Sequence, residues 1–403
     1  MRILQVHNQY RIRGGECRVV DTERTLLQRA GHTVELFGRR SADLEGSSAL
    51  RRLEGLARTP WNRATARALA GVVRRDRPDV AHVHNVFPLI SPSVYAVLAA
   101  LGVPVVQTVH NFRLFCPNGL FFRSGQVCEE CQTRGLFSAV RRRCLHGSFL
   151  VSAAYAGGVW MAWRRGLLRN AVTRFIALSQ FGAERLVGRG LPPSRVTVLG
   201  NFVERFAEGP VRKGDYVLYL GRLSPEKGVM TLLEAAGRLP DMQLRIAGAG
   251  PLEDEIRRWV VSHPEAKVRL EGIVAGEVKE RLIQEALCTV VPSECFESFG
   301  LSAAESLSLG TAVVATRMGG LPELVENGVT GVICEPGDPE SLAGALATLV
   351  NERGRAEAMG KEAVASARVY LSPERHLRGL LGIYRRAVVA KGRAGERGRS
   401  GEP

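Results

Sequence analysis

Lysine is absent from the first 200 residues of this 403-residue chain, which carry 29 arginines and 12 acidic residues and so have a net charge of +17. The remaining residues hold 26 basic and 28 acidic side chains, a net charge of −2. A basic half beside a near-neutral half predicts a polyanionic partner, and an anionic membrane surface is one candidate. Arginine-rich codon bias explains the same counts equally well. No module of interleaved aromatic and basic residues is visible, so we expect no nucleic-acid partner.

Long apolar runs are also scarce. The N-terminal stretch "MRILQVHNQYRIRGG" is too short in apolar residues for a signal peptide, so we expect a cytoplasmic protein with reduced thiols, at most bound to the inner face of the cytoplasmic membrane. The longest uncharged stretch runs from Leu145 to Trp163, with Arg141–Arg143 before it and Arg164–Arg165 after it. Its many Gly, Ser and Ala residues favour a buried or interfacial helix over a membrane span.

The first apolar run, Arg2 to Asn8, leads into Gly14-Gly15 without the Gly-x-Gly-x-x-Gly pattern of dinucleotide-binding proteins, which disfavours an oxidoreductase. Short apolar runs followed by glycine-rich turns and helical patterns continue along the whole chain, as is typical of βα units on a parallel sheet. At 403 residues two domains are expected. The series restarts at Tyr216, so we predict two doubly wound sheets joined near 201–215, with ligands beyond the carboxyl ends of the strands.

In the second half, charged and small residues follow the predicted strands. Gly221-Arg222 and Glu226-Lys227-Gly228 come after the strand ending at Leu220, and two cations beside a helix start are suited to a diphosphate. A solvated loop whose basic residues bind nothing is an equal alternative for this fragment alone. Gly248 and Gly250 follow the next strand, and such a pair is often only turn chemistry.

The stretch "FESFGLSAAES" (296–306) follows another buried strand and places Glu297 and Glu305 eight positions apart. Two carboxylates flanking a bond are typical of a hydrolase. Here Gly300 and the small residues after it would instead let a bound group approach the amides at a helix start. The plainer alternative is that Glu297 caps the turn and Glu305 lies on an exposed face.

Taken together, these residues resemble the retaining glycosyltransferases of family 4, which have the GT-B architecture. The resemblance runs from "MRILQVHNQYRIRGGE" through "GRLSPEKG", "IAGAGP" and "ESFGLSAAESLSLGTAVVATRMGGLPELV" to "NGVTGVICEPGDPESLA". It implies an α/β fold of two Rossmann-like domains facing a central cleft, with a C-terminal helix that crosses back to the N-terminal domain. We expect an acceptor domain at 1–200, a nucleotide-sugar domain at 201–372, the crossover helix at 373–390 and a disordered tail at 391–403.

The resemblance also implies roles for single residues. Arg222 and Lys227 would hold the donor diphosphate and neutralise the leaving group, Glu305 would bind the ribose, and Glu297 would bind the donor sugar. His110 would lie beside the transferred sugar. The remaining donor-binding positions are Gly14, Gly15, Gly248, Gly250, Phe299, Gly300 and Leu301.

The chain has no Asp-x-Asp triplet, the motif that holds a divalent metal in sugar transferases of another architecture. Fixed cations and helix-end amides can stabilise a leaving diphosphate without a metal. We therefore expect a metal-independent reaction. The resemblance implies a retaining transfer from a UDP- or GDP-linked sugar to a glycan or lipid-linked acceptor, with Glu297 as a covalent nucleophile the minor option. The alternatives are a nucleotide-sugar epimerase or phosphorylase of the same fold, and a basic membrane-binding protein without turnover.

Four cysteines lie within the segment 116–144, a Cys-rich loop of the first domain. They are Cys116, Cys128, Cys131 and Cys144. One Cys-x2-Cys pair with a single thiol on either side is compatible with a structural tetrathiolate zinc site, although such sites usually have two pairs. Zinc and free thiols are equally favoured, and disulfides are disfavoured in the cytosol. No cofactor is expected for catalysis.

Overall fold

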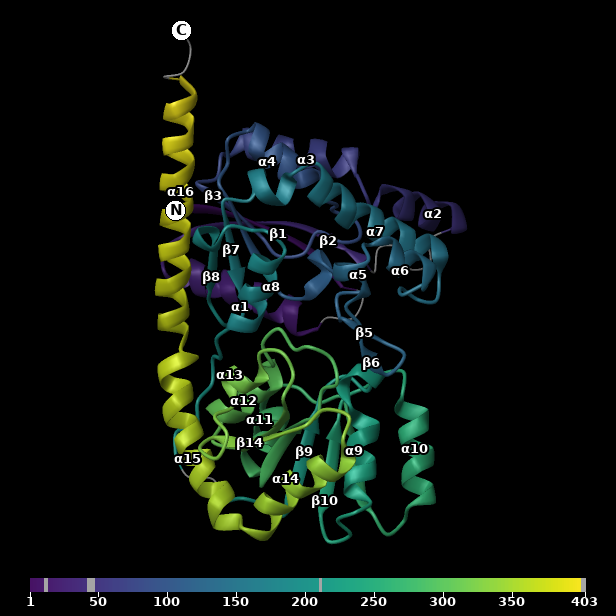
Figure 1. The fold of residues 1–403 in the computed structure, drawn as a ribbon. Coiled ribbons are helices and arrows are strands. Elements are labelled where there is room, and N and C mark those ends of the chain that lie inside the picture. The colour runs from purple at the N-terminus through teal and green to yellow at the C-terminus, as the bar shows by residue number, and fades with distance from the viewer. Residues whose placement is uncertain (11–13, 42–47, 210–211, 400–403) are drawn as a thin grey trace. The chain divides into compact units, whose positions relative to one another are not determined.

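The structure of the chain is a computed structural model that describes residues 1–10, 14–41, 48–209 and 212–399. The chain forms two compact units (Figure 1). Unit 1 comprises Met1–Phe121, Cys128–Leu199 and the chain from Leu377 onward. Unit 2 comprises Phe122–Val127 and Gly200–His376.

Unit 1 is built on a six-stranded parallel sheet with the order β2-β1-β3-β4-β7-β8. Its strands β3 and β4 are buried along their whole length, as expected where helices cover both faces of a parallel sheet. The strands are β1 (Arg2–Gln9), β2 (Thr33–Arg40), β3 (Val80–Val83), β4 (Val105–Val109), β7 (Arg174–Ala177) and β8 (Val196–Val198).

Helices connect these strands, and several begin at a capping side chain, such as Asn62 before α3 and Ser179 before α8. The helices are α1 (Gly15–Arg29), α2 (Ala49–Arg58), α3 (Arg63–Arg75), α4 (Ser93–Ala100), α5 (Glu130–Thr133), α6 (Phe137–Arg141), α7 (Phe149–Arg164) and α8 (Gln180–Gly188), with the short turns η2 (Phe112–Leu114), η3 (Leu167–Ala171) and η4 (Pro193–Arg195). The uncharged stretch Leu145 to Trp163 supplies most of α7. Within the described ranges, no helix has both the length and the apolar character that a membrane crossing needs.

Unit 2 repeats the arrangement with a second six-stranded parallel sheet, ordered β11-β10-β9-β12-β13-β14. Its strands are β9 (Tyr216–Leu220), β10 (Gln243–Ala247), β11 (Lys267–Gly272), β12 (Cys288–Val291), β13 (Ala312–Thr316) and β14 (Gly331–Cys334), and a separate antiparallel pair is formed by β5 (Phe122–Arg123) and β6 (Gln126–Val127). Its helices are η5 (Pro225–Lys227), α9 (Val229–Ala236), α10 (Glu253–Ser262), α11 (Gly276–Glu285), α12 (Leu301–Ser308), α13 (Leu321–Leu324), α14 (Pro339–Asn351) and α15 (Arg353–Tyr370). The two parallel sheets confirm the predicted fold class.

The C-terminal helix α16 (Pro373–Arg399) returns to unit 1, as predicted. Leu380, Ile383, Tyr384 and Ala387 follow the helical period and are buried against the sheet residues Ile3, Val80, Val106 and Ile176. Figure 1 shows α16 running alongside β3, β7 and β8.

The predicted end of this helix at 390 is wrong, because α16 continues to Arg399. The segment "KGRAGERGR" lacks an apolar anchor, but it has no proline, and its Lys, Arg, Ala and Glu residues are good helix formers that extend a helix already nucleated by packing. Residues 400–403 of the predicted tail lie outside the described residues.

Candidate functional site

The loops after β9 and β12 bring Arg222, Lys227 and Glu297 around one side chain of unit 2. Tyr219, on β9, is buried, and burial raises its pKa, while the charges of Lys227, Glu297, Glu226 and Arg222 all act on it. The two loops are tied by a backbone hydrogen bond from Glu294 N to Glu226 O of 3.0 Å. The predicted phosphate-binding and sugar-binding groups therefore lie together at the carboxyl ends of the strands.

Arg222 is held at the rim of this cluster. Its side chain is 58% exposed and is paired with the Glu226 carboxylate, which is only 6% exposed. Its Nε also donates to Ser224 Oγ at 3.0 Å. Burial alone would raise the pKa of Glu226, but the Arg222 charge and a hydrogen bond from Ser224 outweigh burial and lower it. Glu226 thus fixes the guanidinium while leaving much of it accessible.

Lys227 and Glu297 form an ion pair with an Nζ–Oε1 distance of 2.5 Å, and their side chains are 28% and 15% exposed. Ser293 Oγ donates to the same carboxylate oxygen at 2.6 Å. Burial opposes both charges, yet the pKa of Glu297 is lowered by Lys227 and that of Lys227 is raised by Glu297. Both groups therefore keep their charges at neutral pH.

Glu305 has a different cation, which the sequence reasoning did not find. Lys279 Nζ on α11 donates to Glu305 Oε1 on α12 at 2.9 Å, and both side chains are largely buried. In the sequence, Lys279 looks like any surface position of an amphipathic helix. Only the packing of α11 beside α12 makes it a partner for the glutamate.

Three glycines allow the loops of unit 2 to pack this closely. A Cβ on Gly248, whose φ is 147°, would lie 1.8 Å from the Gly221 carbonyl oxygen, and one on Gly250 would lie 2.2 Å from that of Leu223. The predicted pair therefore locks the β10 loop against the β9 loop. Gly319, which the sequence reasoning missed, does the same for Glu297, since its Cβ would lie 2.2 Å from the Glu297 carbonyl oxygen.

Helix α12 begins at Leu301, four residues after Glu297. Gly300 has a φ of 98° and precedes Leu301, the first helical residue, and the helix start has no side-chain cap. Phe299 is buried and Leu301 is half-buried. The amides at this helix end carry the partial positive charge that suits an anionic ligand.

In unit 1, the predicted residues Gly14, Gly15 and His110 lie at one edge of the sheet. Gly14 is exposed and precedes α1, and Gly15 is its first residue. Glu16, in the first turn of α1, accepts a hydrogen bond from Asn111 Nδ2 at 3.1 Å, and Asn111 follows His110 after β4. Residues 11–13 of the predicted loop lie outside the described residues.

Glu16 belongs to a polar group that sequence reasoning missed. Tyr10 donates its hydroxyl to Glu16 Oε2 at 3.0 Å, and the Arg113 guanidinium lies over the rings of Tyr10 and Tyr155. Burial raises the pKa of Glu16 to about 7, although Tyr10, Arg113 and Asn111 all act in the other direction. The signal available in the sequence was Glu16 itself, directly after the glycine pair.

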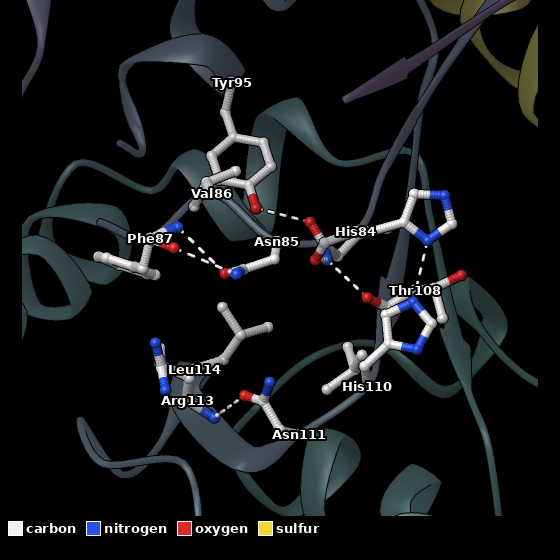
Figure 2. A pocket seen from close by; sticks show the side chains of 12 residues that line it. His84, Asn85, Val86, Phe87, Tyr95, Thr108, His110, Asn111, Arg113 and Leu114 are labelled. Atoms are coloured by element: carbon white, nitrogen blue, oxygen red, sulfur yellow. Dashed lines mark hydrogen bonds between the residues drawn. The ribbon is translucent and has the colours of Figure 1, made fainter. Parts of the chain in front are cut away.

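A small pocket opens between the ends of β3 and β4 (Figure 2). His84 and His110 line it with Asn85, Asn111 and Arg113. His84 Nδ1 and His110 Nε2 lie 2.9 Å apart, a hydrogen-bond distance, and the two rings are stacked with centroids 5.2 Å apart. His110, predicted to lie beside a transferred sugar, is therefore held by a second histidine.

The four cysteines of the 116–144 loop lie near one another. Cys116 and Cys131 are buried, and Cys116 Sγ contacts Asn118 Oδ1 at 2.8 Å. The hydrogen bond between Cys116 and Cys131 lowers the pKa of Cys116 to about 7 and, with burial and the charges of Cys116, Cys144 and Cys128, raises the pKa of Cys131. Of the two, only Cys116 thus has the lowered pKa that suits a zinc ligand. Among the described residues, however, no three of these thiols come within 4.8 Å of one another. The zinc site remains a prediction.

Comparison with known sequences gives two adjoining matches. Residues 13–205 match the family model described as Glycosyltransferase Family 4, and residues 201–365 match the model described as Glycosyl transferases group 1. A glycogen synthase of Mycobacterium tuberculosis is 28% identical over 93% of this chain and 95% of its own length. A D-inositol 3-phosphate glycosyltransferase of Acidothermus cellulolyticus is 35% identical over 72% of this chain and 63% of its own.

Solved structures agree on the fold. Sucrose-phosphate synthase from Thermosynechococcus elongatus superposes with a TM-score of 0.71 at 18% identity, over 96% of this chain and 99% of that chain. HepE of Anabaena in complex with UDP gives a TM-score of 0.65 at 19% identity, over 95% of this chain and 99% of that chain. At these identities the likeness concerns the fold alone.

Proposed function

We propose that this chain, which belongs to the family 4, group 1 glycosyltransferases of the GT-B fold, moves a sugar from a nucleoside diphosphate to a glycan or lipid-linked acceptor, with retention and without a catalytic metal. The observation that carries the proposal is the Lys227–Glu297 ion pair beside Arg222 and the start of α12. It gathers fixed positive charge and a hydroxyl-binding carboxylate at the carboxyl ends of parallel strands.

In the proposed reaction, the bond between the anomeric carbon and the β-phosphate oxygen breaks while the acceptor oxygen attacks from the same face. Negative charge builds on the departing oxygen, and Lys227 and the Arg222 guanidinium stabilise it. The acceptor's proton passes to that phosphate oxygen. No enzymic nucleophile is needed, and Glu297 holds a hydroxyl of the sugar.

The fixed positive charges of Lys227 and Arg222 support a reaction without a metal. Glu297 raises the pKa of Lys227, so the ammonium stays charged throughout the neutral range. Arg222 is more than half exposed and anchored by Glu226, which makes a fixed and accessible charge. Two such cations supply what a divalent ion supplies elsewhere.

The nucleotide end of the donor is assigned to Glu305. A carboxylate ionised beside Lys279 can accept hydrogen bonds from the two ribose hydroxyls. The UDP in the Anabaena HepE complex favours a uridine nucleotide, and a guanosine nucleotide is the second candidate.

The acceptor is proposed to be a glycan or a lipid-linked molecule met at an anionic membrane. Unit 1 exposes Phe137 on α6 and Phe149, Leu150 and Trp160 on α7, and Arg141–Arg143 between the two helices are also exposed. Apolar side chains beside arginines are typical of interfacial helices. Sedimentation with phosphatidylglycerol vesicles should fall when Phe149 and Leu150 become Asp, and should not change for Val261→Asp, a still more exposed apolar residue of unit 2.

A donor screen tests the function. Purified protein is incubated with UDP- and GDP-sugars and membrane extract, and nucleoside diphosphate release is measured. Glu305→Ala should weaken nucleotide binding, while Glu297→Ala should lower turnover more than binding. Glu253→Ala removes a half-buried glutamate that is paired with Arg257 within the helix α10; it is the matched control and should behave as the wild type.

Three outcomes contradict the proposal. Interconversion of nucleotide sugars without transfer indicates an epimerase, and phosphate-dependent glycan cleavage indicates a phosphorylase. No release with any donor, even with membrane extract, indicates a binding protein. Normal turnover of both glutamate variants leaves the family intact and overturns the site assignment.

A further inference from the structure

A buried carboxylate, Glu23 of α1, lies behind the two histidines of the unit 1 pocket. Its side chain is 3% exposed, and three nitrogens face its Oε1. Gln5 Nε2 donates at 3.1 Å, His82 Nδ1 lies at 3.0 Å and His84 Nε2 at 3.6 Å. Tyr384 of α16 closes the far side, with its hydroxyl 2.7 Å from His82 Nδ1.

Glu23, His82 and His84 offer three atoms within 4.8 Å of one another, which raises the question of a metal. The hydrogen bonds of His82 decide against it. Its Nδ1 lies 2.7 Å from the Tyr384 hydroxyl and 3.0 Å from Glu23 Oε1, and both are hydrogen-bond distances, so this nitrogen is already engaged. His82 also has a partner for its other nitrogen, Thr108 Oγ1, at 2.7 Å. His82 is therefore engaged by hydrogen bonds at both ring nitrogens. We call Glu23, His84 and His110 the relay, in which His84 Nε2 faces Glu23 Oε1 at 3.6 Å.

His84 holds one proton, and the position of that proton can be deduced. Burial, then the neighbouring His82, keeps the pKa of His84 well below 6.5 although Glu23 acts in the other direction, so the ring is neutral. Its Nε2 is buried without a hydrogen-bond partner and faces Glu23. With the proton on Nδ1, the lone pair of Nε2 would face a carboxylate oxygen in a dry interior. With the proton on Nε2, an N–H dipole points at the carboxylate instead.

The second arrangement leaves His84 Nδ1 as an acceptor, so the hydrogen bond of 2.9 Å must come from His110 Nε2–H. We propose that Glu23 and His84 are positioning residues that fix His110 as the Nε2–H tautomer, with Nδ1 as a hydrogen-bond acceptor for a hydroxyl of the transferred sugar. The role of His110 rests on the proposed function. The order of protons from Glu23 to His110 does not.

Two further histidines, His7 and His82, lie next to His84. His7 of β1 stacks edge-on to His84, with centroids 6.1 Å apart, and His82 lies beside it at 4.1 Å. Burial lowers the pKa of His7 to about 4 and holds that of His84 well below 6.5, so these two rings are neutral at neutral pH.

Nitrogen NMR of the full chain tests the tautomer without any substrate. The protein has eight histidines, and the His110 and His84 signals are assigned with His110→Asn and His84→Asn. We expect proton-bearing Nε2 in both rings of the wild type. Glu23→Gln, which removes the charge at constant size, should give mixed tautomers in both, and Glu23→Asp should partly restore the wild-type pattern. A proton on His110 Nδ1 in the wild type, or a metal-shifted His84 Nε2, overturns the proposal.

Kinetics test its consequence. Glu23→Gln should lower kcat about tenfold, as for one lost hydrogen bond, with little change in KM for the donor. Tyr384→Phe is the matched control, because it removes the hydroxyl at His82 but leaves the Glu23–His84–His110 order intact. It should lower the melting temperature without changing the His110 tautomer or kcat. Equal losses of kcat in both variants would show a merely structural role. A wild type with the expected tautomers but no turnover would contradict the proposed function alone.

Discussion

Replacing Lys227 with Met removes one charge of the donor-site ion pair at nearly constant volume. At 2.5 Å, and with an effective dielectric constant of about 20, the attraction between Lys227 and Glu297 is roughly 6–7 kcal/mol. Most of this offsets the desolvation of the two groups. Breaking a fully buried pair costs about 3–5 kcal/mol, and the residual exposure of both side chains reduces the expected loss of stability to about 2 kcal/mol at pH 7.

The pH dependence of this loss has a definite sign. In the wild type, the pKa of Glu297 is lowered, so the pair contributes stability above the unfolded pKa of about 4.3 and loses it as the pH falls through the folded value. In Lys227→Met the Lys227 charge no longer opposes burial, which raises the pKa of Glu297, and the hydrogen bond from Ser293 offsets burial only in part. The ionised Glu297 then lowers the free energy of unfolding of the variant above pH 4.3, and protonation of Glu297 restores it. The difference between the two proteins should be largest at neutral pH and shrink toward pH 4.

Urea unfolding at several pH values measures the difference, and nucleoside diphosphate release measures the chemistry. Turnover should fall about 100-fold or more, as when one charge-stabilising group is removed from an active site. Lys227→Met/Glu297→Gln should recover stability at pH 7 without recovering turnover. A stability loss that is independent of pH, or one that grows on acidification, refutes the assignment of an ionised pair.

Three further predictions concern other parts of the chain. Gly248→Ala should lower the free energy of unfolding by about 3 kcal/mol, because its Cβ would collide with the Gly221 carbonyl oxygen. Gly344→Ala in α14, where a Cβ meets open space, is the control and should be neutral or stabilising by about 0.5–1 kcal/mol. Thermal unfolding of both variants measures the difference. Because the folded pKa of Glu16 is raised to about 7, the wild type should lose stability as the pH rises from 5 to 8. Glu16→Gln should remove that loss and be more stable than the wild type at pH 8 by about 1–2 kcal/mol. A variant that is less stable than the wild type at pH 8 contradicts this. Elemental analysis of the wild type should find about one zinc ion per chain. The zinc should be absent from Cys131→Ser and present in Cys334→Ser, which replaces a buried cysteine of unit 2. A wild type without metal would show that the four thiols of the 116–144 loop are free cysteines.

The parallel sheets could be predicted because each strand is a short apolar run with its own turn. The predicted run Arg2–Asn8 is β1 (Arg2–Gln9), and the restart at Tyr216 with a strand ending at Leu220 is β9 (Tyr216–Leu220). The end of α16 could not be predicted, since its extension depends on a helix nucleated by Leu380 and Tyr384 against unit 1.

The donor-site residues could be named from their places after strands, but their partners could not. Lys279 is far from Glu305 in the chain, and nothing in "GEVKERLIQE" marks that lysine. Glu23 and His84 were missed for the same reason. A glutamate inside a helix and a histidine at a strand end look ordinary until packing removes them from water.

The ion pair also answers the question raised by two carboxylates eight residues apart. A hydrolase of the acid–base type needs one carboxyl group with a raised pKa to protonate the leaving group. The pKa of Glu297 is lowered, and Glu305 lies against an ammonium, so neither suits that role. Lys227 and Ser293 both bind Glu297 Oε1, and a carboxylate offers about four acceptor positions, so Glu297 can hold a sugar hydroxyl without releasing Lys227. A single glutamate can thus orient the sugar and keep the cation charged beside the leaving phosphate.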